Sequence, residues 1–396
     1  MLAVLRRPAF TILWLGSLVS LTGDWVLMTG LPLVVYAMTG STLALGVTAA
    51  AGALPRVLVA SFAGVFVDRW DRRQTMLVCN LLLGLSLLPL LVVDSAERLW
   101  LVAPVLLVSS TLVQFYKPAE VALLPRLVPA CELGAANALN GLILNLARLI
   151  GPALGAVLAA WLGLAGIALL DAASFLIAGV CVAMVRVGSG PAGCQHATGV
   201  WREWLDGLRA VRTQVAPRVL IAFLGITGLG EGIMGTLMVP FATRVMHGTE
   251  LTFGALVSAQ AIGGLVGSGV CAQLATRFTA ARLLGLGALL LGAIDLLIFY
   301  APMVTPSALV PVGLMATVGV PAALVTPSIF TLFQTRVRDE QRGRIIGAGL
   351  ATLACSGLLG MLLAGWLGDR VGIVPLLTVQ SLGYIVAGSM VLRLLA

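Results

Sequence analysis

Charged residues are scarce in this sequence of 396 residues, because Asp, Glu, Lys and Arg together make up only 10% of it. Hydrophobic residues make up 60%, and the mean hydropathy is +1.07. A single water-soluble globule cannot cover that much apolar surface with so few polar side chains. The composition therefore excludes the ordinary soluble classes and predicts a protein embedded in a lipid bilayer.

Residues that carry chemistry in soluble enzymes are also few. Lys117 is the only lysine, so no G-x-x-x-x-G-K-[ST] phosphate loop exists and the chain does not hydrolyse ATP by that route. The two histidines, His196 and His247, fall in loops predicted on opposite sides of the membrane, which argues against a shared metal site or proton relay. The six cysteines form no C-x-x-C pair, and no cofactor fingerprint or catalytic constellation is visible. We therefore predict no enzymatic activity, metal or cofactor, and an ion gradient as the energy source.

The apolar residues are grouped into segments long enough to cross the hydrocarbon core as helices, which takes roughly 20 residues each. Their twelve centres lie near residues 23, 55, 84, 110, 148, 175, 231, 264, 292, 319, 356 and 384. The first segment follows Arg6 and Arg7 as a signal peptide would, but its apolar run from Phe10 to Tyr36 is too long for one. The pattern predicts an all-α integral membrane protein with twelve transmembrane helices.

The second half of the chain repeats the first at an offset of about 208 residues. The recurring pairs are Pro32 and Pro240, Gly40 and Gly248, Gly46 and Gly254, and Arg69 and Arg277. Internal repeats of this kind are typical of secondary transporters. We predict two pseudo-symmetric six-helix bundles at residues 1–186 and 218–396, joined by a cytoplasmic linker at 187–217. Helical spacing of apolar residues between Trp201 and Val211 predicts an amphipathic helix on the membrane surface within that linker.

Arginines are distributed asymmetrically between the predicted loops. If the N-terminus is cytoplasmic, the outer loops hold only three arginines, Arg98, Arg244 and Arg370. Cationic loops resist translocation, so this asymmetry predicts that both termini are cytoplasmic. It also accounts for the net charge of +8 without a nucleic-acid partner. We expect a multi-pass protein of the cytoplasmic (inner) membrane of a bacterium.

The loop GVFVDRWDRR concentrates charges between two apolar segments and resembles the signature loop of the major facilitator superfamily, G-x-x-x-D-R-x-G-R-R/K, with Asp71 in place of its second glycine. The matching residues are Gly64, Asp68, Arg69, Arg72 and Arg73. The resemblance implies a conformational gate that locks the cytoplasmic side, with Asp68 facing the positive start of the eleventh helix near Ile345. The arginines suit carboxylates or lipid phosphates, and Glu120 is expected to pair with Arg69 or Arg72. The alternative is that these charges only mark topology.

Further strings narrow the resemblance to a branch of bacterial drug exporters that includes macrolide and enterobactin exporters. They are PAEVALLPRLVP at 118–129, NALNGL at 137–142 and DAASFL at 171–176. The segment ARLIGPALGA at 147–156 also resembles the antiporter motif g-x-x-x-G-P-x-x-G-G through Gly151, Pro152 and Gly155. That similarity implies export. Pro152 favours a kink and the small residues allow close helix contact, so ordinary packing is the alternative interpretation.

Charged residues inside the predicted helices are the candidates for coupling chemistry. They are Asp24, Arg56, Arg148, Asp171, Glu231 and Asp295. A charge near the bilayer centre is costly unless it is paired or hydrated. Asp24 and Glu231 take nearly equivalent places in the first and seventh helices, which by the resemblance line a central cavity, and we expect one or both to couple proton entry to export. The alternative is salt bridges, for example Asp24 with Arg56 or Glu231 with Arg148. For the acids in the sixth and ninth helices we expect structural roles.

The sequence thus predicts a secondary active transporter that works by alternating access. The favoured function is proton-coupled efflux of lipophilic or amphipathic small molecules such as drugs, macrolides or siderophores. The alternative is a lysophospholipid or lipid translocator on the same fold, which a change of thermal stability with lipid headgroups would favour. The expected partners are the substrate, protons and the bilayer.

Overall fold

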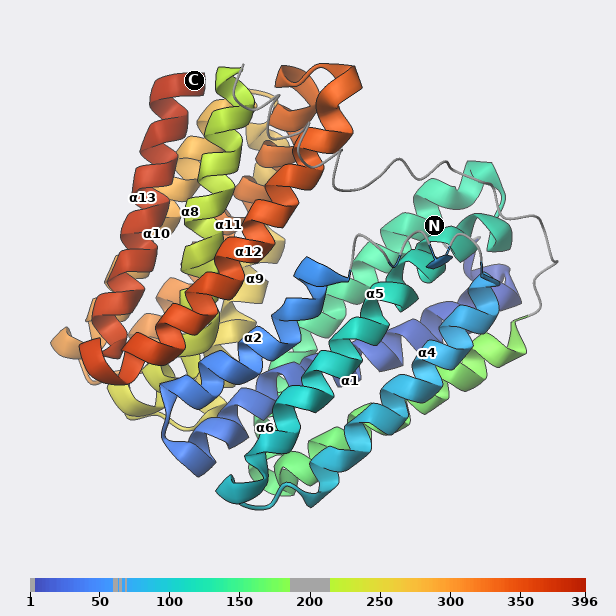
Figure 1. Cartoon of the computed structure of the whole chain (residues 1–396). Coiled ribbons are helices and arrows are strands. Elements are labelled where there is room, and N and C mark those ends of the chain that lie inside the picture. The colour runs from blue at the N-terminus through green and yellow to red at the C-terminus, as the bar shows by residue number, and fades with distance from the viewer. Residues whose placement is uncertain (1–3, 60–62, 64–65, 68–69, 186–213) are drawn as a thin grey trace. The chain divides into compact units, whose positions relative to one another are not determined.

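The computed structural model describes residues 4–59, 63, 66–67, 70–185 and 214–396, and this part of the chain is mainly helical (Figure 1). In the first half the helices are α1 (Pro8–Thr39), α2 (Thr42–Leu58), α4 (Arg72–Leu87), α5 (Val102–Leu127) and α6 (Leu133–Met184). In the second half they are α8 (Val215–Pro240), α9 (Glu250–Leu274), α10 (Ala280–Val304), α11 (Leu309–Arg336), α12 (Asp339–Val371) and α13 (Ile373–Leu395). Shorter turns are η1 (Val4–Arg6), η2 (Leu88–Val92), η3 (Ala96–Leu101), η4 (Ala130–Glu132) and the π-helical turn η5 (Phe241–Val245).

Ten of the described helical segments are long and apolar enough to cross a membrane, and α2 is a shorter apolar helix of 17 residues. Helix α6 has 52 residues, far more than the roughly 20 that one crossing needs. Its backbone leaves helical geometry at Gly163, where φ is 63° and ψ is −167°, a conformation that glycine adopts without a steric cost. The non-helical residue of α6 is therefore Gly163, and the kink that the sequence favours at Pro152 stays a prediction.

The chain divides into two compact units, which we call the first and the second unit. The first comprises Met1–Gly40 and Ala51–Ala197, and the second comprises Ser41–Ala50 and Thr198–Ala396. The beginning of α2 therefore belongs to the second unit, although it lies early in the sequence. Residues 186–213, which hold most of the predicted linker and its surface helix, lie outside the described residues, and α8 begins at Val215.

In the first unit, α1 packs against α6, and α4 packs against α5 and α6. Glycines bring α1 and α6 together, since a Cβ atom at Gly30 would lie 2.7 Å from Cδ1 of Ile167 and one at Gly155 would lie 2.7 Å from the carbonyl oxygen of Val26. Lipid is as apolar as the helix surfaces, so close packing between small residues replaces the hydrophobic effect as the force between helices.

In the second unit, α8 packs against α12 and α13, α9 against α11, and α10 against α11 and α13. Small residues again mark the crossings. A Cβ atom at Gly232 would lie 2.1 Å from the carbonyl oxygen of Gly357, and one at Gly263 would lie 1.8 Å from that of Ala316. The glycine-rich stretch of α8 around Glu231 is therefore continuous helix in which Gly232 serves close packing.

Candidate functional site

A small polar cavity lies inside the first unit between α1, α4, α5 and α6. Its polar lining residues are Ser17, Ser20, Asp24, Tyr116, Lys117 and Glu120. The cavity volume of about 20 Å³ accommodates one water molecule, and the lining offers the several polar partners that a buried water needs. This cavity brings Asp24 together with one cation, Lys117, and a second acid, Glu120.

Glu120 is held by two donors on two helices. Lys117 donates to its Oε2 at 3.0 Å from one turn earlier in α5, and Ser17 of α1 donates to its Oε1 at 3.1 Å. The glutamate side chain is 19% exposed, so most of it is removed from solvent. Within the described residues Glu120 forms its ion pair with Lys117 and not with Arg72, and because Arg69 lies outside them the alternative pairing with Arg69 stays a prediction.

Asp24 lies on α1 next to a close contact with α6. A Cβ atom at Gly23 would lie 2.5 Å from Oδ1 of Asp171 and 2.4 Å from Oγ of Ser174, so only glycine allows this approach. Asp171 is 1% exposed and accepts a hydrogen bond from Ser174 at 3.1 Å. The carboxyl group of Asp171 in α6 therefore lies against Gly23 of α1, and the next residue of α1 is Asp24.

The antiporter-like motif forms the other part of the contact between α1 and α6. A Cβ atom at Gly151 would lie 2.3 Å from Cβ of Trp25, the residue that follows Asp24, and the next helical turn contacts α1 through Gly155. Pro152 is buried in the same interface. The motif therefore fixes the position of the helix turn that carries Asp24. This contact fits both the interpretation as an export-linked motif and the interpretation as ordinary helix packing.

The two intramembrane arginines of the first unit do not neutralise Asp24. Arg56 and Arg148 both have exposed side chains, and within the described part of the chain neither forms an ion pair with Asp24. The alternative of a salt bridge between Asp24 and Arg56 is therefore wrong in this structure. The cation that shares the cavity with Asp24 is Lys117.

Two acids within the apolar helices of the second unit, Glu231 and Asp295, have neutral partners on α13. Glu231 of α8 has an exposed side chain and accepts a hydrogen bond from the hydroxyl of Tyr384, which is buried. Asp295 of α10 is 1% exposed and accepts from Nε2 of Gln380 at 2.8 Å. Ser381 in turn donates to Oε1 of Gln380 at 3.4 Å. The observed partner of Glu231 is thus Tyr384.

Part of the predicted gate lies outside the described residues, namely Gly64, Asp68 and Arg69. Asp71, which replaces a glycine of the signature, is the N-cap of α4 and accepts from the backbone N–H of Gln74 at 2.8 Å. Arg73 donates to the carbonyl oxygen of Val182 at 3.2 Å and to that of Ala183, the last carbonyls of α6. Asp71 therefore caps α4 itself, and Arg73 joins the start of α4 to the end of α6. The interaction of Asp68 with the eleventh helix stays a prediction.

A second ion pair joins the beginnings of α1 and α6. Arg7 donates to Glu132 through Nε at 2.7 Å and through Nη2 at 3.1 Å, the forked geometry that arginine makes with carboxylates. The hydrogen bond that Arg7 donates to Glu132 raises the pKa of the Arg7 guanidinium above its ordinary value. The pair is partly exposed, so it fixes geometry more than it adds stability.

Several polar residues of these clusters were missed from the sequence. Ser20 and Ser17 lie one and two turns before Asp24 on one face of α1, and this spacing is the signal that would have found them. Tyr384 and Gln380 carry no such signal, because an isolated polar residue in an apolar helix does not reveal its partner. Asn80 in α4 was also missed; it is fully buried, and its amide has no hydrogen-bond partner within the described part of the chain.

Comparison with known proteins agrees with this architecture. The chain is 29% identical to the multidrug efflux pump Tap of Mycobacterium tuberculosis, with 98% of this chain and 94% of that protein covered. It is 24% identical to macrolide efflux protein A of Streptococcus pyogenes, with 92% and 90% covered. These relatives are named as efflux proteins.

Solved structures show the same fold at low sequence identity. A bacterial homologue of the iron transporter ferroportin, in an inward-facing state, aligns with a TM-score of 0.78 at 18% identity over 97% of this chain and 98% of that one. The nucleoside transporter NupG aligns with a TM-score of 0.79 at 12% identity over 98% and 100%. The sequence profile of the Major Facilitator Superfamily matches residues 13–356, and the chain therefore belongs to that superfamily, as a multi-pass membrane transporter of its drug-exporter-like branch.

Proposed function

We propose that this protein is a proton-coupled exporter of lipophilic or amphipathic small molecules, and that Asp24 carries the coupling proton. The observation that carries the proposal is the polar cavity of the first unit, where Asp24 shares a water-sized space with Lys117 and Glu120. A carboxyl group at membrane depth needs hydration or a partner to ionise, and this cavity offers both. The efflux function named for two relatives supports small molecules as the cargo.

The proposed cycle uses the polar residues around Asp24 as the proton's surroundings. A water in the cavity would connect Asp24 with Ser17 and Glu120, whose carboxylate is already held by Lys117. Gain or loss of a proton at Asp24 changes the charge of the cavity by one unit, and this change biases the packing of α1 against α5 and α6. Alternating access then converts that bias into movement of substrate.

Glu231 takes a different part in the proposal. Its side chain is exposed and accepts a hydrogen bond from the hydroxyl of Tyr384. This arrangement suits a carboxylate that contacts substrate and attracts cationic compounds. Asp295 is buried and joined to Gln380, which suits a structural role. Arg56 and Arg148 are exposed and are assigned no part in proton coupling.

The topology belongs to the same proposal. Twelve crossings in two six-helix bundles result if α6, interrupted at Gly163, crosses twice and α2 crosses once alongside the other described spans. The arginine distribution of the sequence then puts both termini in the cytoplasm of a bacterium, and the loop with Asp68 on the cytoplasmic side as the gate.

The test is gradient-driven uptake of lipophilic dyes and macrolides into everted membrane vesicles. The parent protein is compared with Asp24→Asn, Glu231→Gln and the control Asp94→Asn, whose carboxyl is exposed and paired with Arg98 four residues away. We expect Asp24→Asn to lose uptake driven by a pH gradient while keeping exchange of labelled for unlabelled substrate, because exchange needs no net proton movement. Glu231→Gln should raise the apparent KM for cationic dyes.

Full gradient-driven uptake by Asp24→Asn would refute the coupling role of that residue. If no dye or macrolide moves in vesicles that contain folded protein, export of these compounds is wrong and lysophospholipids become the next substrates to assay. If only Glu231→Gln loses gradient-driven uptake, the coupling acid lies in the second unit.

A further inference from the structure

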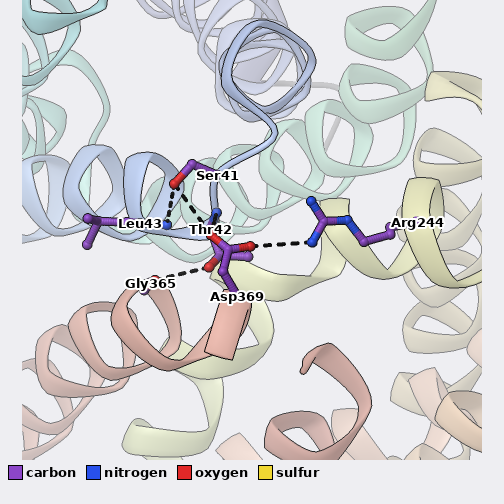
Figure 2. Close-up of polar contacts among 6 residues, drawn as sticks. All are labelled: Ser41, Thr42, Leu43, Arg244, Gly365 and Asp369. Atoms are coloured by element: carbon purple, nitrogen blue, oxygen red, sulfur yellow. Dashed lines mark hydrogen bonds and ion pairs between the residues drawn. The ribbon is translucent and has the colours of Figure 1, made fainter. Parts of the chain in front are cut away.

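The beginning of α2 is joined to the end of α12 by a polar cluster made of Thr42, Asp369 and Arg244, which we call the Asp369 cluster (Figure 2). Asp369 Oδ2 accepts from the backbone N–H of Thr42 at 2.9 Å, and Oδ1 accepts from Nη1 of Arg244 at 3.4 Å. The hydroxyl of Ser41 also donates to Asp369 at 3.5 Å. All these residues belong to the second unit.

The contact between Thr42 and Asp369 is a helix cap supplied from a distance. The first N–H groups of a helix lack intrahelical acceptors and carry a partial positive charge, so a carboxylate stabilises them. Such a cap ordinarily comes from the residue just before the helix. At α2 this residue, Ser41, accepts from the backbone N–H of Leu43 at 3.2 Å, whereas the N–H of Thr42 is capped by a carboxylate that lies 327 residues away in sequence. The first N–H of α2 is therefore satisfied by Asp369 only while the helix lies against α12.

Packing below the cap is close enough to need glycine on both helices. A Cβ atom at Gly46 would lie 2.7 Å from Cα of Gly365, and one at Gly368 would lie 2.7 Å from Oγ1 of Thr42. The hydroxyl of Thr42 donates to the carbonyl oxygen of Gly365 at 3.0 Å, and the threonine is fully buried. The cap therefore lies at the edge of a small, shape-matched contact.

The division of the chain shows why this contact bears on transport. Helix α2 starts in the second unit at Ser41–Ala50 and continues into the first unit from Ala51. In the topology proposed above, this start is on the outer side of the membrane. A rocking motion that opens the outer side has to separate the start of α2 from α12 or bend α2.

We propose that Asp369 is a positioning residue of the transport cycle, whose cap on α2 and ion pair with Arg244 stabilise the outer-closed state and are released when the outer side opens. The inference goes beyond the proposed export function, because it names the residues that set the balance between two states whatever the substrate. It also differs from the Asp68 gate, which the sequence places at the opposite side of the membrane.

The test measures the opening directly and needs no substrate. Spin labels are attached at Leu43→Cys and Val371→Cys, two exposed positions beside the cluster, after replacement of the six native cysteines, and their distance distribution is recorded in lipid nanodiscs. Asp369→Ala should raise the ratio of long to short distances roughly fivefold, the usual effect of losing an N-cap. Asp369→Asn keeps an acceptor for Thr42 and should raise it only about twofold, because it loses just the partly exposed ion pair.

A second pair of variants isolates the backbone N–H of Thr42. Thr42→Pro removes the donor at a position where proline starts helices well, whereas Thr42→Val removes only the hydroxyl. We expect Thr42→Pro to resemble Asp369→Ala, and Thr42→Val to resemble the parent. Asp94→Ala, an acid in the described loop between η2 and η3, is the control and should leave the distribution unchanged.

Unchanged distances in Asp369→Ala and Thr42→Pro, in protein that is monodisperse and keeps its unfolding temperature, would overturn the inference. If Asp369→Ala does not fold, the pair Thr42→Pro and Thr42→Val decides it alone. Vesicle transport by the parent protein is recorded in parallel. If the parent transports but the variants keep unchanged distances, only the role of the Asp369 cluster is refuted. If the variants show shifted distances but the parent does not transport, only the export proposal is refuted.

Discussion

Asp24 and Glu231, the acids in the first helix of each unit, have different kinds of partner. In the first unit, Asp24 faces a cavity that also holds Lys117 and Glu120. In the second unit, Asp295 and Glu231 receive hydrogen bonds from the neutral side chains of Gln380 and Tyr384. Related halves of one sequence have thus kept acids in their first helices while changing the partners. A cavity that contains both acids and a cation can gain or lose a proton and so change its charge. A carboxyl group that is hydrogen-bonded to a neutral donor is better suited to a fixed position.

The largest effect should come from closing the space at Gly23. Gly23→Ala forces a methyl group against Asp171 and Ser174, and we expect a loss of about 3 kcal/mol in the free energy of unfolding, measured by SDS titration in mixed micelles. Gly179→Ala is the matched control in α6, because its nearest contact is Cβ of Asn80 at 3.5 Å. It should leave stability unchanged or raise it by about 0.5 kcal/mol. Equal stability of the two variants would contradict the close approach of α6 to α1.

The buried pair of the second unit should come next. Gln380→Ala leaves the Asp295 carboxyl without its donor, at an expected cost of about 2 kcal/mol in unfolding free energy. The double variant with Asp295→Ala should cost less than the sum of the single variants, because neither partner is then left unsatisfied. Strict additivity in this double-mutant cycle would show that the two side chains do not interact.

A smaller effect tests the hydroxyl donors of the two units against each other. Ser17→Ala and Tyr384→Phe each remove one O–H that donates to a carboxylate, Glu120 or Glu231, at about 1 kcal/mol each in unfolding free energy. Ser17→Ala should in addition slow gradient-driven uptake, since the serine lines the cavity. A loss of uptake in Tyr384→Phe alone would move the coupling site to the second unit.

The smallest stability effect is expected at the ion pair of the cavity. Lys117→Gln should cost about 1 kcal/mol or less, because the lysine side chain is 47% exposed. Arg98→Gln breaks an exposed pair with Asp94, whose side chains are 53% and 70% exposed, and should change nothing measurable by the same SDS titration. If both variants behave alike, Glu120 does not depend on Lys117, and the comparison between the units loses its electrostatic basis.

Much of the architecture was predictable because it depends on local composition. Apolar segments indicated the membrane and the helices, and the signature loop indicated the superfamily, which the sequence profile confirms. Asp24 and Glu231 stood out because a charge is conspicuous in an apolar helix. Their partners were not predictable, and the two salt bridges considered from the sequence involved Arg56 and Arg148, which are exposed here.

The sequence by itself determined that the chain is a helical membrane transporter. Lipid requires every backbone polar group to be satisfied within a helix, so each crossing appears in the sequence as a long apolar segment. The tertiary structure decided which side chains meet. Helix rotation and glycine contacts brought Asp24 to Lys117 and Glu120, and Gln380 to Asp295. The cap of Asp369 on Thr42 joins residues 327 positions apart, and such a contact depends on packing between helices that no local pattern encodes.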